Sequence, residues 1–386
     1  MKILMIAPEP FFEPRGTPFS EFFRIAALCE LGHRVDLVTY PLGEDVVIRG
    51  LSITRSWKPP GLKVVKTGPS LAKVVLDFFL FFKVWGRLRR ERYHLIHTHE
   101  EANIMGVFFN RRFGIPHLYD MHSSLVQQMD NFKFTRLKAV IGFFRWIEKK
   151  SLTNAASVIV ICRSLYDHAA AIAGSDKLTL IENFRDSLEE QDLDPQKIRT
   201  LRSRLGDPGQ KIVMYTGTLE TYQGIPLLLE AFRLLPQTFR LVLVGGKPYQ
   251  VRKLKKKLAE MKLEDRVICT GRRPPGEIPY YLKAADVLVS PRVLGTNIPL
   301  KIYSYLKSGI PVVATDLYTH TQSLTSRIAI LVPPDPRGLA DGMTRALTPR
   351  GREVARAAIR HCRSRYSKEK YLELVARAVD KAGNFS

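Results

Sequence analysis

The chain has 386 residues, of which 45% are hydrophobic and 25% charged, which suits a globular protein with two domains. Lys and Arg number 60 against 37 Asp and Glu, so the formal net charge is +23 and an anionic partner is expected: nucleic acid, an acidic membrane surface or a phosphorylated ligand. The four cysteines are widely spaced, which argues against a disulfide framework and favours a reducing cytoplasm. No signal peptide is expected at the start, and no membrane-spanning helix is expected, because no run of about 18 uncharged apolar residues is present.

Short apolar runs alternate with helical patterns through the first half of the chain. Strands are expected at KILMIAP, RVDLVTY, YHLIHTH, IPHLYDMH, ASVIVIC and LTLIEN. Helices are expected at SEFFRIAALCELGH, with Ser20 as its N-cap and Gly32 as its stop, at residues 102–113, and in a segment ending near Leu152. This alternation predicts a parallel sheet with helices on both faces.

The same rhythm restarts at KIVMYTG and continues through FRLVLVGG, RVICTG, DVLVSP, PVVAT and IAILVPP. In LGTNIPLKIYSYLKSGIPVVATD, Pro299 fits the first turn of a helix and Gly309 the position after its end. The polar segment 185–210 predicts a domain boundary. We therefore expect a first domain over 1–190, a second over 191–348, and C-terminal helices over 349–386 that pack back toward the first. Ligands of such domains bind at the carboxyl ends of the strands.

The ordered set of segments resembles glycosyltransferase family 4. The resemblance rests on RGTPFSEFFRIAALCELGHRVDLVT, HLIHTH, DMH, LIEN, YTGTLETYQGIPLLLEAF, LVLVGG, YYLKAADVLVSP and KIYSYLKSGIPVVATD, and it covers nearly the whole chain. It implies an α/β protein of the GT-B fold, with two Rossmann-like domains facing a central cleft. It also implies a retaining glycosyltransferase whose substrate is a UDP- or GDP-linked sugar, with no cofactor and no bound metal.

The resemblance places the donor site in the second domain, where this chain departs from the family. Thr218 and Gln223 stand where an Arg and a Lys are usual, and Thr296 and Ser304 stand where two Glu are usual. The diphosphate then needs other positive charge. Lys301 is the main candidate, because a Lys in the first turn of a helix opposes the helix dipole unless an anion is bound there. A solvated surface cation is the alternative.

The full set of expected donor-binding residues follows from these segments. It comprises Gly16, Thr17, Gly217, Thr218, Gln223, Gly246, Arg272, Arg292, Asn297, Lys301 and Ser304. Gly16 permits close backbone approach to a ligand, and the N–H groups of Gly16 and Thr17, ahead of the helix, are expected to meet a phosphate or a sugar hydroxyl.

The first domain is expected to supply the catalytic residue. His122 ends LYDMH, and the resemblance implies that it contacts the transferred sugar near its reacting carbon; a His bonded to a core carbonyl is the alternative. His97 and His99 flank Thr98 and are expected on opposite faces of a strand. The HTHEE spacing matches no common zinc pattern, so no metal is expected. Arg15, His99 and Glu100 are expected on the acceptor side.

Two segments combine aromatic and basic side chains: PSLAKVVLDFFLFFKVWGRLRRERY and FKFTRLKAVIGFFRWIEKK. Helices of this kind lie in membrane interfaces, and a buried helix with basic ends is the alternative. We therefore expect a protein that is peripheral on the cytoplasmic, inner face of a membrane and acts on a lipid-linked or glycan acceptor.

Two functions remain open at this point. The first is a membrane-associated retaining glycosyltransferase of glycan or glycolipid biosynthesis. The second is a noncatalytic GT-B protein that binds a sugar or nucleotide, suggested by the replaced charged residues. Nucleic acid is not expected as a partner, because no nucleic-acid-binding module is recognised.

Overall fold

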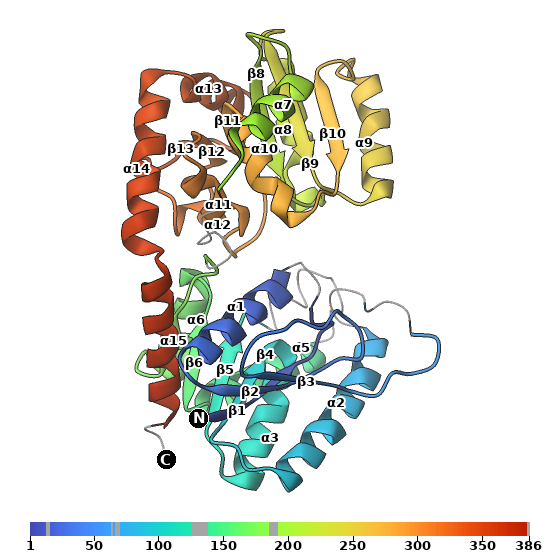
Figure 1. Cartoon of the computed structure of the whole chain (residues 1–386), viewed down its shortest axis with the longest axis vertical. Coiled ribbons are helices and arrows are strands. Elements are labelled where there is room, and N and C mark those ends of the chain that lie inside the picture. Colours follow the sequence, from blue (N-terminus) through green and yellow to red (C-terminus); the bar gives the residue numbers. More distant parts are fainter. Residues whose placement is uncertain (13–15, 63–64, 66–69, 125–137, 185–191, 384–386) are drawn as a thin grey trace. The chain divides into compact units, whose positions relative to one another are not determined.

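The computed structural model describes residues 1–12, 16–62, 65, 70–124, 138–184 and 192–383, which form two compact units (Figure 1). The first unit comprises Met1–Arg185 with Lys368–Ser386, and the second comprises Asp186–Ser367. Each unit is a parallel sheet with helices packed on it, so the expected α/β architecture of two Rossmann-like domains is confirmed. Among the described helices, none has the length and apolar character needed to cross a membrane.

The sheet of the first unit has seven parallel strands in the order β3-β2-β1-β4-β5-β6-β7. They are β1 (Lys2–Ala7), β2 (Arg34–Thr39), β3 (Leu51–Arg55), β4 (Leu95–His99), β5 (His117–Met121), β6 (Ser157–Val160) and β7 (Leu178–Leu180). Six strands coincide with the expected apolar runs. Strand β3 was not expected, because LSITR mixes polar and apolar residues; it lies at the sheet edge and is only partly buried.

Helices cover both faces of this sheet (Figure 1). They are α1 (Gly16–Glu30), α2 (Leu71–Arg90), the 3-10 helix η1 (Glu100–Ala102), α3 (Asn103–Phe113), α5 (Lys138–Asn154), α6 (Arg163–Ala173) and α15 (Lys368–Gly383). Helices α2 and α3 pack in one hydrophobic cluster with Leu4, Ile6 and Ile96 of the sheet. Helices α1 and α15 pack together.

Helix α1 begins earlier than the sequence pattern indicated. Ser20 lies inside the helix and is buried, so its expected role as N-cap is wrong. Pro18 occupies the first turn, where a missing N–H breaks no helical hydrogen bond. Gly32 has a φ of 83°, so its expected role as the helix stop is confirmed.

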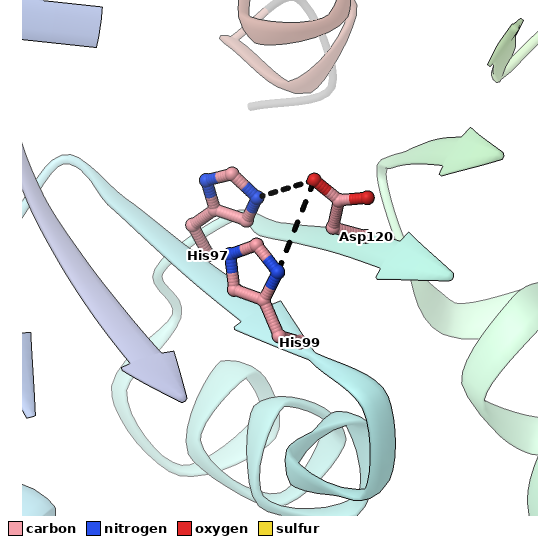
Figure 2. Close-up of side chains that lie close together, drawn as sticks. All are labelled: His97, His99 and Asp120. Carbon is pink, nitrogen blue, oxygen red and sulfur yellow. Dashed lines mark ion pairs between the residues drawn. The ribbon is translucent and has the colours of Figure 1, made fainter. Parts of the chain in front are cut away.

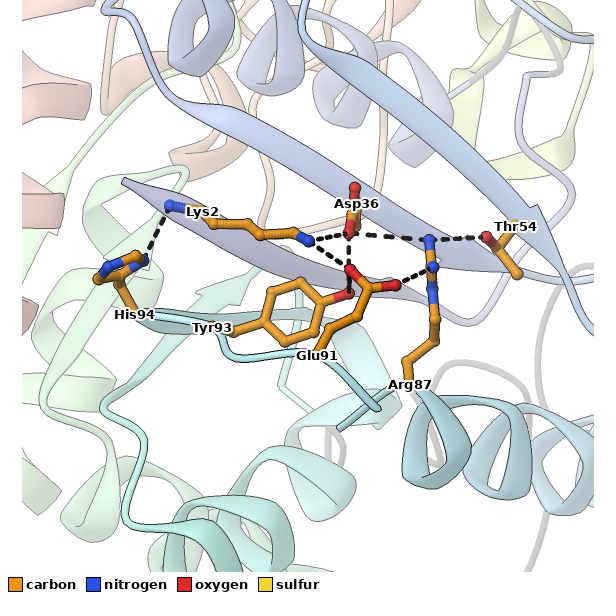
Figure 3. A network of polar contacts seen from close by, with 7 residues as sticks. All are labelled: Lys2, Asp36, Thr54, Arg87, Glu91, Tyr93 and His94. Carbon is orange, nitrogen blue, oxygen red and sulfur yellow. Dashed lines mark hydrogen bonds and ion pairs between the residues drawn. The ribbon is translucent and has the colours of Figure 1, made fainter. Parts of the chain in front are cut away.

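A polar network fastens the end of α2 to the amino edge of the first sheet (Figure 3). The Asp36 carboxylate accepts a hydrogen bond of 2.8 Å from the Tyr93 hydroxyl and lies 3.5 Å from Lys2 Nζ and 3.7 Å from Arg87 Nη2. Lys2 and Arg87 also pair with Glu91. Because β1 starts at Lys2, this network lies at the edge opposite the carboxyl ends of the strands, and its role is structural.

The second unit has six parallel strands in the order β10-β9-β8-β11-β12-β13. They are β8 (Lys211–Thr216), β9 (Phe239–Val244), β10 (Val267–Gly271), β11 (Val287–Ser290), β12 (Val312–Thr315) and β13 (Ile330–Val332). Its helices are α7 (Pro195–Leu205), η3 (Thr221–Gln223), α8 (Ile225–Arg233), α9 (Pro248–Glu260), η4 (Pro275–Glu277), α10 (Ile278–Ala284), α11 (Lys301–Ser308), α12 (Tyr318–Thr321), α13 (Pro336–Ala346) and α14 (Pro349–Arg365). Helices α8 and α13 share one hydrophobic core with the sheet.

The two C-terminal helices belong to different units. Helix α14 packs on α11 and α13 within the second unit, whereas α15 packs on α1, β6 and β7 within the first. The polar segment expected as a linker contains α7, which packs on α10 in the second unit. The chain therefore changes unit twice, after residue 185 and after residue 367.

Candidate active site

Glycines let the loops at the carboxyl edge of the second sheet approach one another closely. Gly224 has a φ of 75°, and a Cβ there would lie 1.8 Å from the carbonyl oxygen of Pro291. Gly245 has a φ of 127°, and a Cβ there would lie 2.0 Å from the carbonyl oxygen of Gly217. These positions bring the loops after β8, β9 and β11 into contact at one edge of the sheet.

Lys301 lies at the start of α11 among these loops. Its Nζ donates to Gln223 Oε1 at 3.2 Å and lies 3.7 Å from the centre of the Tyr215 ring. No Asp or Glu in the described part of the chain forms an ion pair with it. Burial, and secondly the charge of Arg292, lower the pKa of Lys301 well below its ordinary value. An ammonium held this way is stabilised by a bound anion.

Arg292 is the second cation at this edge. Its Nε donates to Leu294 O at 2.8 Å, its Nη1 donates to Asn297 O at 3.0 Å, and its guanidinium lies over the Tyr222 ring at 5.2 Å. Burial lowers the pKa of Arg292, and no carboxylate pairs with it among the residues that the structure describes. The loop from β11 to α11 is thus held by Arg292 and carries positive charge next to Lys301.

Four other expected donor residues, Gln223, Ser304, Asn297 and Thr218, belong to these loops or to α11. Gln223 is 8% exposed and contacts Lys301 directly. Ser304 follows Lys301 by three residues, so it shares a face of α11 with it. Asn297 contributes a carbonyl that accepts from Arg292 and from Thr319. The backbone carbonyl of Thr218 accepts from the Tyr215 hydroxyl.

Two expected donor residues of the second unit, Gly246 and Arg272, have looser connections to Lys301. Gly246 follows β9 with a φ of 87°, and a Cβ there would lie 2.4 Å from a methyl carbon of Leu219. Arg272 is exposed after β10, with no hydrogen bond or ion pair to any described residue. Gly16 and Thr17 belong to the first unit; they form the start of α1 rather than preceding it, so their N–H groups lie in the first helical turn.

Sequence reasoning missed the groups that hold this edge of the second sheet together. His320 Nε2 lies 2.9 Å from Ser290 Oγ, and its Nδ1 lies 2.9 Å from Thr315 O, so it links α12 to the ends of β11 and β12. Burial lowers the pKa of His320 to about 4, which keeps the ring neutral beside the two cations. The Tyr215 ring beneath Lys301 was also missed, because the two residues meet only in the folded chain.

In the first unit, a buried cluster forms where β4 and β5 end (Figure 2). The rings of His97 and His99 stack with centres 4.8 Å apart. The expectation that they lie on opposite faces is wrong, because residues two apart in a strand share a face. His97 Nε2 lies 3.6 Å and His99 Nδ1 lies 4.0 Å from Asp120 Oδ2, on the neighbouring strand β5.

Asp120 is ion-paired to a buried arginine. Arg24 Nε, from α1, donates to Asp120 Oδ2 at 2.8 Å, and Arg24 Nη1 donates to the Tyr371 hydroxyl of α15 at 3.1 Å. Burial acts to raise the pKa of Asp120, but the charges of Arg24 and His122 outweigh it and hold the pKa well below its ordinary value. Asp120 is therefore a carboxylate at neutral pH, and its pairing with Arg24 links β5 to α1 and, through Tyr371, to α15.

His122 lies one residue beyond β5 at the edge of this cluster. It is 4% exposed, and its Nε2 lies 3.3 Å from Asp120 Oδ1 and 3.2 Å from His99 Nδ1. Burial lowers the pKa of His122 to about 4, an effect that Asp120 only partly opposes. The imidazole is therefore neutral at pH 7, the form that both donates and accepts a hydrogen bond.

The same cluster brings together a set of metal-ligating atoms. One ligand atom each of His97, His99 and Asp120 lie within 4.8 Å of one another. However, Arg24 donates to the same oxygen of Asp120 that faces the two rings. A fixed guanidinium at that oxygen opposes a second cation, so these residues fit a buried ion-pair network better than a metal centre. Metal-independent activity stays a prediction.

Acidic side chains border the histidine cluster. Glu100, expected on the acceptor side, has a φ of 45° and accepts a hydrogen bond of 2.9 Å from Ser123. Burial, followed by the charges of Glu101 and Glu9, raises the pKa of Glu100 well above its ordinary value. His99 is the second residue expected on the acceptor side, and its Nδ1 lies 3.9 Å from Glu21 Oε1. The third, Arg15, lies outside the described residues.

Comparison with known proteins identifies a family domain in each half of the chain. A family model described as "Glycosyl transferase 4-like domain" matches residues 25–183, and one described as "Glycosyl transferases group 1" matches residues 210–349. The matched ranges contain the histidine cluster and the Lys301 loops, respectively.

Curated relatives match parts of the chain. TuaC of Bacillus subtilis, a glycosyltransferase named for teichuronic acid biosynthesis, is 26% identical over 60% of this chain and 55% of its own length. Alpha-monoglucosyldiacylglycerol synthase of Streptococcus pneumoniae is 25% identical over 57% of this chain and 51% of its own length. The chain thus matches about half the length of these relatives.

Solved structures match the whole chain at low identity. Sucrose-phosphate synthase of Thermosynechococcus elongatus aligns with a TM-score of 0.79 at 21% identity, covering 100% of both chains. HepE of Anabaena in complex with UDP aligns with a TM-score of 0.76 at 17% identity, covering 98% of this chain and 100% of HepE. At these identities the likeness establishes the fold.

Proposed function

The chain belongs to the GT4-type glycosyltransferases, and from this premise we propose that it transfers a sugar from a nucleotide-sugar to a membrane-associated, lipid-linked acceptor with retention of configuration. The observation that carries the proposal is Lys301, a partly buried ammonium with no carboxylate partner in the described part of the second unit. It lies at the carboxyl ends of parallel strands, where α/β proteins of this type bind ligands.

In the proposed reaction, the bond between the anomeric carbon and the donor diphosphate breaks, and its electron pair stays on the diphosphate. The acceptor oxygen bonds to the same carbon on the same face, and its proton passes to the departing phosphate oxygen. Lys301 and Arg292 stabilise the negative charge that develops on this leaving group. We assign the neutral His122 to a hydrogen bond with the transferred sugar.

The lipid-linked acceptor is inferred from the name of one relative and from the surface of the first unit. One curated relative is named for the synthesis of a glycosylated diacylglycerol. In addition, helices α2 and α5 of the first unit expose Phe78, Phe82, Phe143 and Trp146, each more than half exposed, beside lysines and arginines. Aromatic and basic side chains of this kind suit a membrane interface, and we propose peripheral binding at its cytoplasmic face.

A noncatalytic nucleotide-binding role is the second candidate. It is favoured by Gln223, which occupies the position of a family cation and accepts a hydrogen bond from Lys301. If Lys301 replaces the cation that the family has at the position of Gln223, the protein still binds the nucleotide. Catalysis survives only if Lys301 reaches the leaving group in the loaded protein.

The experiment that separates these functions uses purified full-length protein and a panel of radiolabelled UDP- and GDP-sugars, incubated with membrane lipid extract. Transfer of label to the organic phase, with an α-linked product from an α-linked donor, supports the proposed activity. Nucleotide binding without transfer or hydrolysis supports the noncatalytic role. Absence of binding to every nucleotide in the panel contradicts both.

A further inference from the structure

A cavity of about 450 Å³ opens between α3 and α5 of the first unit. Its apolar walls are formed by Ile104, Val107, Phe108, Trp146 and Ile147. This volume is in the range that binds small molecules, about 300–1,000 Å³. None of its lining residues belongs to the histidine cluster or to the Lys301 loops, so the proposed transfer reaction does not account for it.

Three cationic residues and Ser151 complete the lining of the cavity. The cations are Arg111 and Arg112, in the last turn of α3, and Lys150 of α5. Arg111 Nη2 donates to Asn154 Oδ1 at 3.1 Å, and the Arg112 guanidinium lies over the Phe113 ring at 5.5 Å. None of the three forms an ion pair with an acidic side chain of the described chain. An occupant with an anionic end would supply the charge that the protein does not.

The cavity continues into an exposed aromatic surface. Phe108 is 42% and Trp146 is 56% exposed although both line the cavity. Phe108 packs against Phe81 of α2 at 5.3 Å between ring centres, and Trp146 stacks with the exposed Phe143 at 6.2 Å. Apolar side chains thus lead from the cavity across α2, α3 and α5 to solvent.

We propose that this cavity seats one anionic phospholipid of the membrane, with an acyl chain between α3 and α5 and the phosphate at Arg111, Arg112 and Lys150. Hydrocarbon walls ending in unpaired cations match an amphiphile with a phosphate head. The exposed aromatic surface next to the cavity is the kind that enters a bilayer interface, which favours a bilayer lipid over a protein segment. The proposal extends the membrane part of the proposed function by naming the lipid and its seat.

Calorimetric titration with monomeric short-chain lipids tests the seat without a bilayer. Dihexanoyl-phosphatidylglycerol is expected to bind the full-length protein more tightly than dihexanoyl-phosphatidylcholine. Arg111→Glu with Arg112→Glu is expected to weaken phosphatidylglycerol binding by about tenfold or more. The matched control, Arg89→Glu with Arg90→Glu, makes the same charge change in the last turn of α2. It is expected to leave affinity within about twofold.

A second pair of variants tests the cavity by volume rather than charge. Val107→Phe fills the cavity and is expected to weaken binding of both lipids, whereas Val74→Phe adds the same bulk on the exposed face of α2 and is expected to change neither. Thermal unfolding of each variant checks that the fold is kept. The proposal is overturned if the unmodified protein binds no monomeric lipid, or if both charge pairs weaken binding equally. Tighter binding of an isoprenyl diphosphate than of phosphatidylglycerol also overturns it.

This test and that of the proposed function fail independently. The lipid test measures how substitutions of cavity residues in the first unit change lipid affinity. The donor test measures how substitution of Lys301 in the second unit changes nucleotide affinity. Cavity variants are therefore expected to bind nucleotide as the parent does.

Discussion

Replacing Lys301 with Met tests whether the carboxyl edge of the second sheet holds an anion. Lys301 Nζ has Gln223 Oε1 and the Tyr215 ring as neighbours and forms no ion pair with a carboxylate of the described chain. Met keeps most of the side-chain length and removes the charge. We expect Lys301→Met to be at least as stable as the parent, because a partly buried charge without a counter-ion disfavours folding.

The expected loss of donor affinity follows from the contact that is removed. A unit charge about 4 Å from a phosphate oxygen gains about 4 kcal/mol at an effective dielectric constant of about 20. Desolvation offsets part of this, and a hydrogen bond to a charged group contributes about 1.5–3 kcal/mol net. Since each 1.4 kcal/mol is about tenfold, Lys301→Met is expected to weaken nucleotide binding by about 10- to 150-fold.

Isothermal titration of UDP and GDP into parent and variant measures this loss. Lys256→Met, which makes the same charge change at an exposed position on α9, is the matched control and is expected to bind as the parent does. The reasoning is refuted if Lys301→Met binds the preferred nucleotide within about twofold of the parent.

The pH dependence of stability provides an independent check on Lys301. Its pKa is lower in the folded chain than in the unfolded chain, so the unfolded chain binds more protons at pH values between these two pKa values. Unfolding free energy of the parent should therefore rise relative to Lys301→Met as pH increases toward the ordinary pKa of lysine. A constant difference between the two proteins across that range contradicts the assignment.

Four further predictions follow from other contacts. Asp120→Asn should lower the free energy of unfolding by about 3–5 kcal/mol, because Arg24 loses its buried partner; a urea-unfolding loss below about 1 kcal/mol would contradict this. His122→Ala should lower the transfer rate by about tenfold or more while nucleotide affinity is kept, and an unchanged rate would remove His122 from the reaction. The Glu148 hydrogen bond at 2.6 Å raises the pKa of His168, so its stabilisation is present at low pH and is lost as pH rises through that pKa. The cost of His168→Gln in urea unfolding should accordingly be larger at about pH 5.5 than at about pH 8.5, and the reverse order would be wrong for this pair. Transfer should continue at full rate after dialysis against EDTA, and recovery only on adding a divalent cation would show a required metal.

Most of the fold is predictable because buried parallel strands consist of short runs of apolar residues in the sequence. LVLV and VVAT are recognisable as strands from the sequence alone, because a strand that is covered on both faces is a continuous run of apolar residues. LSITR failed this criterion because β3 lies at the sheet edge with partly exposed residues. The start of α1 was misplaced for a different reason: Ser20 is a good N-cap by type, but Pro18 also suits a first turn, and the helix begins at Gly16.

The candidate site is predictable from the sequence only where a residue type is unfavourable in the local secondary structure expected around it. Lys301 could be found because a Lys in a first helical turn opposes the helix dipole. Its contact with Gln223, 78 residues away, required the fold. The same holds for Arg24, which is 96 residues from Asp120 and 347 from Tyr371. The shared face of His97 and His99, by contrast, follows from the sequence alone, because the two-residue period of a strand places them on one face.

A crystal structure of the full-length protein with UDP or GDP bound tests the central claim most directly. The account predicts a diphosphate oxygen within hydrogen-bonding distance of Lys301 Nζ, with the Gln223 amide no longer its acceptor. A nucleotide bound elsewhere, with Lys301 still donating to Gln223, would contradict it.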